Sequence, residues 1–362
     1  MTTFSRTIGV VNGGGDCPGL NAVIRAVVRK AKLEYGWRVI GVTNGFNGLI
    51  WPEQSSELTL ESVRGILARG GTILSTMNRI NPFAFPVDEN GRSVVRDYSS
   101  RCIEGMKKSE IEALVVIGGD GTLTIAHELA KIGVKVVGIP RTIDNNLLAT
   151  EVTFGFDTAL HVATDAIDRL QTTAESHHRV MVIEVMGFDS GWIALHSGLA
   201  GGANVVLIPD IPFTIETICK SIKSREKQGY PFSQVVVTEG MKLPPRDALG
   251  KPFPKTQPGQ VGNAIGFAIR EYTDKEVRVT VLGHVRWGGS PSPFDRNLAT
   301  RLGIFAVDPV ARGEYDQMVC LPEGRIQSVP LADAIGATRL VDPQSDFVRA
   351  ARAVGITFGD RP

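Results

Sequence analysis

The sequence of 362 residues lacks long apolar runs, and none approaches the roughly 18–20 residues that a membrane-spanning helix requires. The N-terminal segment Met1–Arg6 leads directly into a strand-like segment, without the basic and then apolar stretches of a signal peptide. The formal net charge is only +1, so no excess of one sign favours nucleic acid or an anionic membrane. These absences predict a cytoplasmic protein with no nucleic-acid partner and no membrane partner.

Cysteine is also scarce. The four cysteines, Cys17, Cys102, Cys219 and Cys320, are far apart in the sequence, and no pair has the CxxC spacing of a metal site. Thiols in such a pattern are typical of proteins in a reducing compartment. We therefore expect four structural thiols.

Glycine, in contrast, is abundant. The chain has 40 glycines in 362 residues, well above the roughly 7% of an average protein. They cluster beside apolar runs and form no low-complexity tract, which predicts backbone conformations or close approaches that glycine alone permits.

Strand-like runs alternate with helical patterns along the whole chain. Strands are expected at Thr7–Asn12, Arg38–Thr43, Ala113–Ile117, Lys135–Ile139, Val180–Val185, Val205–Ile208, Val235–Thr238 and Arg278–Leu282. Helices are expected at Leu20–Leu33, Leu123–Ile132, Ala159–Thr173, Ile215–Gln228 and Gly262–Tyr272. This alternation predicts an α/β fold of two similar lobes that meet near Pro140, each with a mostly parallel sheet covered on both faces. Ligands of such sheets bind at the carboxyl ends of the strands.

Two glycine-rich segments lie where an expected strand gives way to a helix: Asn12–Asn21 (NGGGDCPGLN) and Ile117–Thr122 (IGGDGT). Glycine there lets backbone N–H groups approach an anion, and the helix N-terminus adds partial positive charge. Neither segment has the GK[ST] of a Walker A motif or the GxGxxG of a dinucleotide site. Two such loops can enclose one polyphosphate, and Asp120 supplies the hard oxygen that Mg²⁺ prefers. A tight turn and a helix N-cap at Asp120 are the structural alternatives.

A third segment, Pro140–Asn146 (PRTIDNN), follows the expected strand at Lys135–Ile139. Asp144 lies there beside hydroxyl and amide groups, where a carboxylate can accept a proton from an attacking hydroxyl. A turn-forming aspartate is the alternative. Arginine and histidine near further strand ends, in Glu175–Arg179 and Arg278–Pro291, suit a phosphate monoester.

Taken in order, these segments resemble the phosphofructokinase family from about Ile8 to Gly303. The resemblance implies two Rossmann-like lobes with mostly parallel sheets. It assigns 1–140 with about 289–340 to a donor-binding lobe, 141–288 to a sugar-phosphate-binding lobe and 341–362 to a C-terminal tail. It also implies a homo-oligomer, dimer or tetramer, whose active sites are completed by a neighbouring subunit. The implied glycolytic reaction uses Mg²⁺ and transfers the γ-phosphoryl group of ATP to the 1-hydroxyl of fructose 6-phosphate, giving fructose 1,6-bisphosphate and ADP.

The resemblance also assigns site residues by position. The phosphoryl donor and Mg²⁺ would be held by Gly15, Arg79, Gly119, Asp120, Gly121 and Thr122, with Asp120 closest to the metal. The sugar would be contacted by Thr142, Asp144, Met186, Gly187 and Glu239, and its 6-phosphate by Arg179, Arg278 and His284, the two arginines reaching across from the neighbour. The catalytic group would comprise Asp144 as the base, with Thr142 and Gly15. Arg141 is added to this group as a hypothesis of our own, because it is an extra cation near these loops.

The choice of phosphoryl donor depends on two positions. Within the family, glycine at the position of Gly121 is associated with room for a nucleotide, whereas aspartate there accompanies the use of pyrophosphate. A carboxylate would crowd and repel an α-phosphate, so Gly121 favours ATP. Arg141 complicates this interpretation, because pyrophosphate users carry a lysine there.

Three positions depart from the family. Asn146 replaces an aspartate, and Phe188 and Trp287 each replace an arginine. Phosphoryl transfer depends on positioning and charge, so these losses should slow the reaction unless another group compensates. One hypothesis is that Arg141 or Arg286 supplies the missing charge, in which case Arg141→Ala should lower turnover more than affinity. The alternatives are a pocket for a different sugar phosphate, or weak activity.

Three functions therefore remain open. The leading one is an ATP-dependent 6-phosphofructokinase. The second is a pyrophosphate-dependent fructose 6-phosphate 1-phosphotransferase on the same fold. The third is a weakly active paralogue with a regulatory binding role. A dehydrogenase is excluded, because the glycine fingerprint and its acidic ribose partner are missing.

Overall fold

The computed structural model describes residues 6–77, 80–246, 250 and 252–361, which divide into two compact units. The first unit is formed by the chain up to Ile143, by Leu147–Asp157 and by Trp287–Ala337. The second unit is formed by Asp144–Asn146, by Thr158–Arg286 and by the chain from Thr338 onward.

These boundaries differ from the expected lobes in two places. Residues 147–157 lie in the first unit, because Phe154 pairs with Arg141 and the Thr153 hydroxyl donates to the Thr142 carbonyl at 2.6 Å. The expected tail belongs to the second unit, where Thr357 pairs with Val205. The sequence pattern alone predicts neither the pairing of Phe154 with Arg141 nor the pairing of Thr357 with Val205.

The first unit is built on a seven-stranded sheet in the order β13-β12-β7-β6-β1-β2-β3. The bounds are β1 (Thr7–Asn12), β2 (Arg38–Val42), β3 (Ser56–Glu57), β6 (Ala113–Gly118), β7 (Val136–Pro140), β12 (Gln317–Cys320) and β13 (Gln327–Pro330). The five inner strands are parallel, and the short edge strands β3 and β13 are antiparallel to their neighbours.

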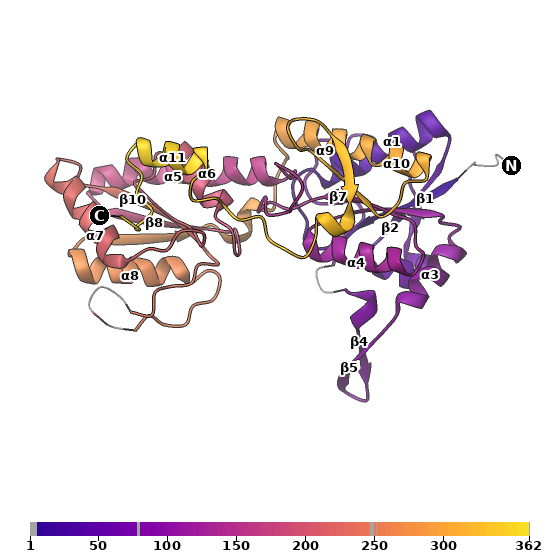
Figure 1. The fold of residues 1–362 in the computed structure, drawn as a ribbon, viewed down its shortest axis with the longest axis horizontal. Coiled ribbons are helices and arrows are strands. Elements are labelled where there is room, and N and C mark those ends of the chain that lie inside the picture. Colours follow the sequence, from indigo (N-terminus) through magenta and orange to yellow (C-terminus); the bar gives the residue numbers. More distant parts are fainter. Residues whose placement is uncertain (1–5, 78–79, 247–249, 251, 362) are drawn as a thin grey trace. The chain divides into compact units, whose positions relative to one another are not determined.

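Helices cover both faces of this sheet (Figure 1). One face carries α1 (Leu20–Tyr35), α9 (Pro293–Phe305) and α10 (Val307–Arg312), and the other carries α3 (Ser99–Lys108) and α4 (Asp120–Lys131). The unit also contains the short helix α2 (Asn47–Ile50) and a hairpin of β4 (Phe85–Glu89) and β5 (Arg92–Arg96). Every residue of β1 and β6 is buried, as expected for parallel strands covered on both sides.

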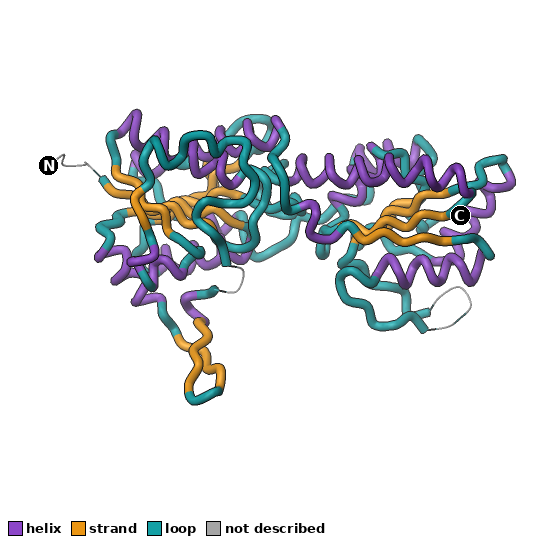
Figure 2. The backbone as a smooth tube through the Cα atoms, turned by 180° about the vertical axis from the view of Figure 1, so that it is seen from behind, coloured by secondary structure: helices purple, strands orange, loops and turns teal. Residues whose placement is uncertain are grey.

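The second unit has a four-stranded parallel sheet in the order β11-β8-β10-β9. The strands are β8 (Val180–Val185), β9 (Val205–Leu207), β10 (Ser233–Thr238) and β11 (Val277–Val281). Figures 1 and 2 show α5 (Phe156–His177), α6 (Trp192–Ala200) and α11 (Asp346–Ala353) over one face, and α7 (Ile215–Lys227) and α8 (Val261–Thr273) over the other. The predicted α/β class with mostly parallel sheets is confirmed in both units.

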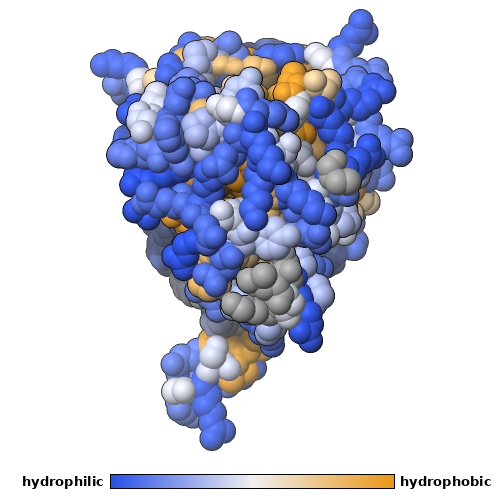
Figure 3. Space-filling model, turned by 90° about the vertical axis from the view of Figure 1, so that its left-hand side faces the viewer, coloured by the Kyte–Doolittle hydropathy of each residue, from blue (hydrophilic) through white to orange (hydrophobic). Residues whose placement is uncertain are grey.

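The surface of the second unit seen in Figure 3 is mostly hydrophilic. Among the residues that the structure describes, no helix combines the length and the apolar character needed to cross a membrane. The apolar side chains instead fill the cores of the units; in the second unit, for example, Ile218, Val235 and Ile265 are buried together between the sheet and helices α7 and α8.

Candidate functional site

Three loops leave the first sheet at one edge, because β1, β6 and β7 are parallel neighbours. Backbone hydrogen bonds join these loops: the Gly13 N–H donates to the Ile117 carbonyl at 3.0 Å, and the Arg141 N–H donates to the Gly118 carbonyl at 2.9 Å. The buried Thr122 side chain packs against the glycines, where a Cβ on Gly13 or Gly118 would lie 2.5 or 2.3 Å from it. The two glycine-rich segments found in the sequence therefore form one compact surface.

Arg141 packs against the first of these loops. Its side chain is only 6% exposed, and its Nη2 donates a hydrogen bond to the Gly13 carbonyl. Gly14 has φ +77°, and a Cβ there would lie 2.7 Å from the same Nη2. Arg141 thus fixes the shape of the loop from within, and it brings a cation close to it.

Trp287 lies against the same loop. A Cβ on Gly15 would fall 1.9 Å from the indole ring, so the loop and the ring are in direct contact. Trp287 is one of the positions where the resemblance led us to expect an arginine. The contact explains why position 15 has to be glycine in this chain.

The second glycine-rich segment leads into α4. Gly119 is the N-cap, with no side-chain cap, and Asp120 is the first helical residue, so the N-cap alternative for Asp120 was wrong. The exposed Asp120 instead accepts a hydrogen bond from the Gly336 N–H at 2.8 Å through Oδ1. Gly121 is exposed, and a Cβ there would meet nothing within 4 Å. Asp120 and Gly121 at the start of α4 are therefore exposed, which suits an anion at a helix N-terminus.

The described residues contain no group of three or more His, Cys, Asp and Glu side chains that could hold a metal ion. Asp120 would therefore offer one carboxylate ligand and no complete protein cage. Mg²⁺ in nucleotide sites typically takes one or two carboxylates and completes its shell with phosphate oxygens and water. The residues present fit a magnesium ion that arrives with a phosphoryl donor.

In the second unit, Glu239 directly follows β10 and is 8% exposed. The pKa of Glu239 is raised to about 7, mainly by burial; the charge of the Arg286 guanidinium opposes this rise, and the charges of Asp144 and Glu184 add to it. A carboxyl group in this state changes its charge near neutral pH.

Glu184, on β8, has a structural role. Its two carboxylate oxygens accept the N–H groups of Gly259 and Gly262, each at 2.7 Å, at the start of α8. A carboxylate at a helix N-terminus satisfies otherwise unpaired amides.

The segment Asp144–Asn146 is supported by the C-terminal part of the chain. Asp144 is 5% exposed, and the Asn145 carbonyl next to it accepts from Arg339 Nε at 3.2 Å and Nη2 at 2.8 Å. The Arg339 N–H donates to the Asn146 carbonyl at 2.9 Å, and its guanidinium lies 4.2 Å from the centre of the Trp192 ring. The sequence analysis missed Arg339, because nothing in the local pattern connects it to a loop almost 200 residues earlier.

The turn after β8 carries three of the residues of interest. Met186 is 5% exposed, and Gly187 has φ +146°, with a Cβ there only 2.5 Å from the Ser190 carbonyl. Phe188 follows with φ +45° and is 50% exposed, an uncommon conformation for a bulky residue. The turn therefore presents an aromatic side chain to solvent at a position where the resemblance led us to expect an arginine.

The residues expected at the 6-phosphate separate into two places within the second unit. His284 is exposed on the turn Gly283–Arg286, at the carboxyl end of β11. Arg179 precedes β8 and Arg278 lies near the start of β11, where Glu276 forms ion pairs with both, at 2.8 Å to Arg179 Nε. A six-residue strand spans about 20 Å, so the two arginines do not reach the end of the sheet that carries Glu239.

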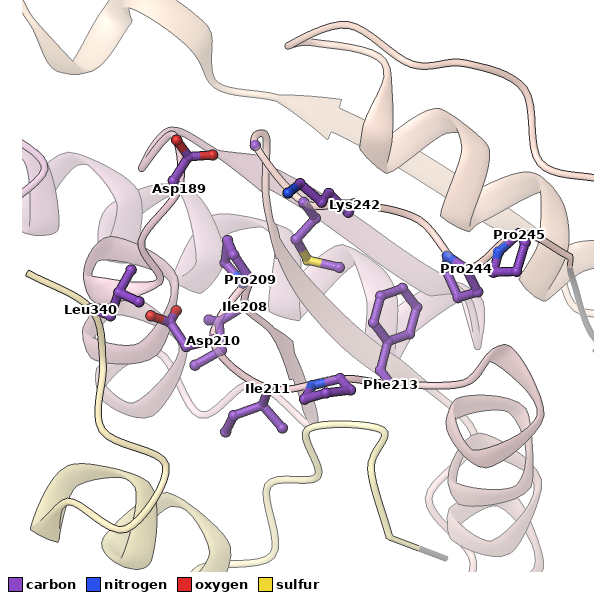
Figure 4. Close-up of a pocket in the computed structure, with 13 residues that line it drawn as sticks. Asp189, Ile208, Pro209, Asp210, Ile211, Phe213, Lys242, Pro244, Pro245 and Leu340 are labelled. Carbon is purple, nitrogen blue, oxygen red and sulfur yellow. The ribbon is translucent and has the colours of Figure 1, made fainter. Parts of the chain in front are cut away.

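Two cavities open in the second unit. One, of about 430 Å³, is lined by Glu239 and by the loop residues that follow it. The other, of about 570 Å³, is drawn in Figure 4, with Asp189, Lys242 and Phe213 around it and Leu340 of the C-terminal segment at its side. The sequence analysis did not foresee the second cavity. Its other carboxylate, Asp210, is held by the N–H groups of Gly191 and Val341.

The remaining predictions concern Arg79, Thr142 and the four cysteines. Arg79 lies outside the described residues. Thr142 is buried in the first unit, and its carbonyl accepts from Thr153. All four cysteines are free and buried, and burial raises the pKa of each thiol.

The chain is similar to known proteins over nearly its whole length. The family model described as Phosphofructokinase matches residues 7–310. An "ATP-dependent 6-phosphofructokinase" from Chloroflexus aggregans is 51% identical over 360 residues, which cover 99% of each chain. A "Pyrophosphate--fructose 6-phosphate 1-phosphotransferase" from Amycolatopsis methanolica is 47% identical over 347 residues, covering 93% of this chain and 96% of the other.

Solved structures agree with this result. The phosphofructokinase from Saccharomyces cerevisiae matches with a TM-score of 0.77 and 30% identity, over 91% of this chain and 45% of the yeast chain. The resemblance predicted from the ordered motifs is thereby confirmed, and this chain belongs to the phosphofructokinase family.

Proposed function

We propose that the protein is an ATP-dependent 6-phosphofructokinase, which transfers the γ-phosphoryl group of ATP to the 1-hydroxyl of fructose 6-phosphate. The observation that carries the proposal is the open first turn of α4, where Gly121 has nothing within 4 Å of a Cβ position. A nucleotide needs this room beyond its terminal phosphates. The names of full-length relatives near 50% identity support the same reaction.

The reaction would depend on the glycine loops with Arg141, and on the carboxylates of Asp144 and Asp120. Backbone N–H groups of the glycine loops would hold the donor phosphates, and Arg141 would keep the first loop in shape through its bond to Gly13. Asp144 would accept the proton of the attacking sugar hydroxyl. Asp120 would bind the magnesium ion, which supplies charge neutralisation at the transferred phosphoryl group.

A homo-oligomer is part of the proposal. Arg179 and Arg278 lie at the opposite end of their sheet from Glu239, so one chain cannot use all three on one sugar phosphate. A neighbouring subunit that contributes its Arg179 and Arg278 would complete the site, with the exposed His284 gripping the same 6-phosphate. The four free, buried cysteines are consistent with a reducing cytoplasm.

The second candidate is the pyrophosphate-dependent reaction. The observations in its favour are the cation Arg141 at the first loop and the relative from Amycolatopsis methanolica, which is named for that reaction. Pyrophosphate is shorter than ATP and needs no room beyond its second phosphate. The uncovered Gly121 therefore ranks ATP first.

The deciding experiment supplies the purified protein with Mg²⁺, fructose 6-phosphate and either ATP or pyrophosphate, and follows fructose 1,6-bisphosphate. Product with ATP alone is the expected result, and product with pyrophosphate alone would reverse the ranking. If neither donor gives product, the enzymatic proposal fails for this acceptor. Calorimetric titration with fructose 6-phosphate then tests the regulatory binding role.

A further inference from the structure

The cavity of about 570 Å³ in the second unit lies at the carboxyl ends of three parallel strands (Figure 4). Its walls come from the turn after β8, from the loops after β9 and β10, and from the C-terminal segment. Ligands of parallel α/β sheets bind at this end of the strands, and the volume is within the roughly 300–1,000 Å³ of small-ligand sites. None of the described residues assigned to the proposed reaction lines it. The reaction therefore leaves the ligand of this cavity unassigned.

Most of the cavity wall is apolar and rigid. Its lining includes Pro209, Pro212, Pro244 and Pro245, and Phe213 adds an aromatic ring. A proline has a fixed φ and carries no N–H group, so these four positions hold their shape and donate no backbone hydrogen bond. This part of the wall therefore suits the apolar body of a ligand, and any charged group of the ligand has to be bound elsewhere in the cavity.

Asp210 holds three parts of the wall together. Its Oδ2 accepts from the Gly191 N–H at 2.8 Å, and its Oδ1 accepts from the Val341 N–H at 2.7 Å. These bonds join the loop after β9 to the turn after β8 and to the C-terminal segment. Because each oxygen already has a protein partner, Asp210 contributes negative charge to the cavity and leaves the direct ligand contacts to other residues.

The two other charged side chains of the lining, Asp189 and Lys242, have no such partner. Both are exposed, and neither forms a hydrogen bond or an ion pair within the part of the chain that the structure describes. In Figure 4 both lie in the upper part of the view, above Ile211 and Phe213. One carboxylate and one ammonium group are therefore available to a ligand at the same side of an apolar cavity.

These charges decide which class of ligand fits. A phosphate group would meet two carboxylates and one ammonium group, so repulsion would offset the attraction of Lys242. A ligand with only one charged group would leave either Asp189 or Lys242 unpaired. A free amino acid uses both, because its ammonium group donates to Asp189 and its carboxylate accepts from Lys242. Both charges of an α-amino acid are attached to one carbon, which matches two charged groups at one side of the cavity, whereas those of a peptide lie at its opposite ends.

We propose that this cavity binds a free α-amino acid with an apolar side chain. The ammonium group of the ligand contacts Asp189, its carboxylate contacts Lys242, and its side chain packs against the prolines and Phe213. This ligand is neither the phosphoryl donor nor the sugar acceptor, so the inference does not depend on the proposed function.

The test is calorimetric titration of the full chain with three compounds that share one phenylethyl body. L-Phenylalanine carries both charges, phenethylamine lacks the carboxylate, and 3-phenylpropionate lacks the ammonium group. We expect L-phenylalanine to bind at least about tenfold more tightly than either analogue, because each analogue loses one charge-assisted contact. L-Serine keeps both charges but lacks the apolar body, so it should also bind at least about tenfold more weakly. Equal affinities for the four compounds, or no binding of L-phenylalanine, would overturn the proposal.

Two variants at exposed positions assign the contacts. Asp189→Asn should weaken L-phenylalanine at least about tenfold and leave 3-phenylpropionate unchanged, because that analogue has no ammonium group to lose. Lys242→Gln should weaken L-phenylalanine by a similar factor and leave phenethylamine unchanged. Asp165→Asn and Lys227→Gln, which are exposed in the same unit, are the controls and should change no affinity. If Asp189→Asn and Lys242→Gln both bind L-phenylalanine as the wild type does, the amino acid binds elsewhere and the inference fails. These titrations contain neither ATP nor fructose 6-phosphate, so such a failure leaves the proposed reaction to be decided by its own product assay.

Discussion

The two units prepare their ligand sites by different means. In the first unit, the glycine loops are fixed by backbone hydrogen bonds and by packing against Thr122. In the second unit, the site depends on buried side-chain charges: the pKa of Glu239 is raised to about 7, and Arg286 has no hydrogen-bond partner among the residues that the structure describes. A site built from backbone groups tolerates few substitutions of its glycines. In a site built from charged side chains, a single substitution can change the net charge and the pKa values of the other groups.

The largest effect is expected from the proposed base of the second unit. Asp144→Asn keeps the size of the side chain but cannot accept the proton, so kcat should fall by roughly 10³-fold or more. Steady-state kinetics with ATP and fructose 6-phosphate measure the change. The control is Asp165→Asn, an exposed aspartate on α5 that pairs with Arg169. A loss of less than tenfold in kcat for Asp144→Asn would show that another group removes the proton.

The next prediction tests the glycine loops of the first unit by substituting two glycines that differ in the space around them. Gly13→Ala places a methyl group 2.5 Å from Thr122, in a loop that cannot shift without breaking its bond to Ile117. Its free energy of unfolding should fall by about 1–3 kcal/mol, as is usual for overpacking a buried position. Gly121→Ala has open space and should change it by less than about 1 kcal/mol. Urea denaturation compares the two, and equal losses would mean that the close packing around Thr122 relaxes.

The same contrast explains how much of the fold could be predicted from the sequence. The strands at Thr7–Asn12 and Val180–Val185 are observed with the predicted bounds, because buried parallel strands form unbroken apolar runs flanked by glycine or polar residues. The short edge strand β3 and the hairpin β4–β5 were not predicted, since exposed strands with mixed polar residues lack such a run.

The site was predictable where it depends on local sequence and hidden where it depends on tertiary contacts. The glycine loops are apparent from their spacing. The support of Asp144 by Arg339 is not, because the contact joins positions almost 200 residues apart. The sequence also suggested Arg286 as an extra cation, but it could not reveal that the side chain is fully buried.

A smaller effect on donor choice tests whether the room at Gly121 matters. Gly121→Asp should fold normally, because nothing lies within 4 Å of the new Cβ. Its carboxylate would repel the α-phosphate of ATP, so kcat/KM for ATP should fall by about 100-fold, which corresponds to about 3 kcal/mol. Gly121→Asn is the control that adds bulk without charge. If the aspartate variant retains the full ATP activity, the room at position 121 does not set donor choice.

The last prediction concerns the charge of Glu239 and is measured as stability against pH. Burial raises the pKa of Glu239 from 4.5 to about 7, so the folded protein holds a proton that the unfolded chain releases. The wild type should therefore lose stability relative to Glu239→Gln as the pH rises from about 4.5 to about 7, by on the order of 3 kcal/mol in total. Below pH 4.5 the two proteins should be equally affected by this group. Urea denaturation at pH 4.5 and pH 8 gives the difference, with the exposed Glu175→Gln as the control. A difference that stays constant between these pH values would mean that the charge of Arg286 offsets the cost of burying the ionised Glu239 carboxylate, so that the pKa of Glu239 is close to its ordinary value.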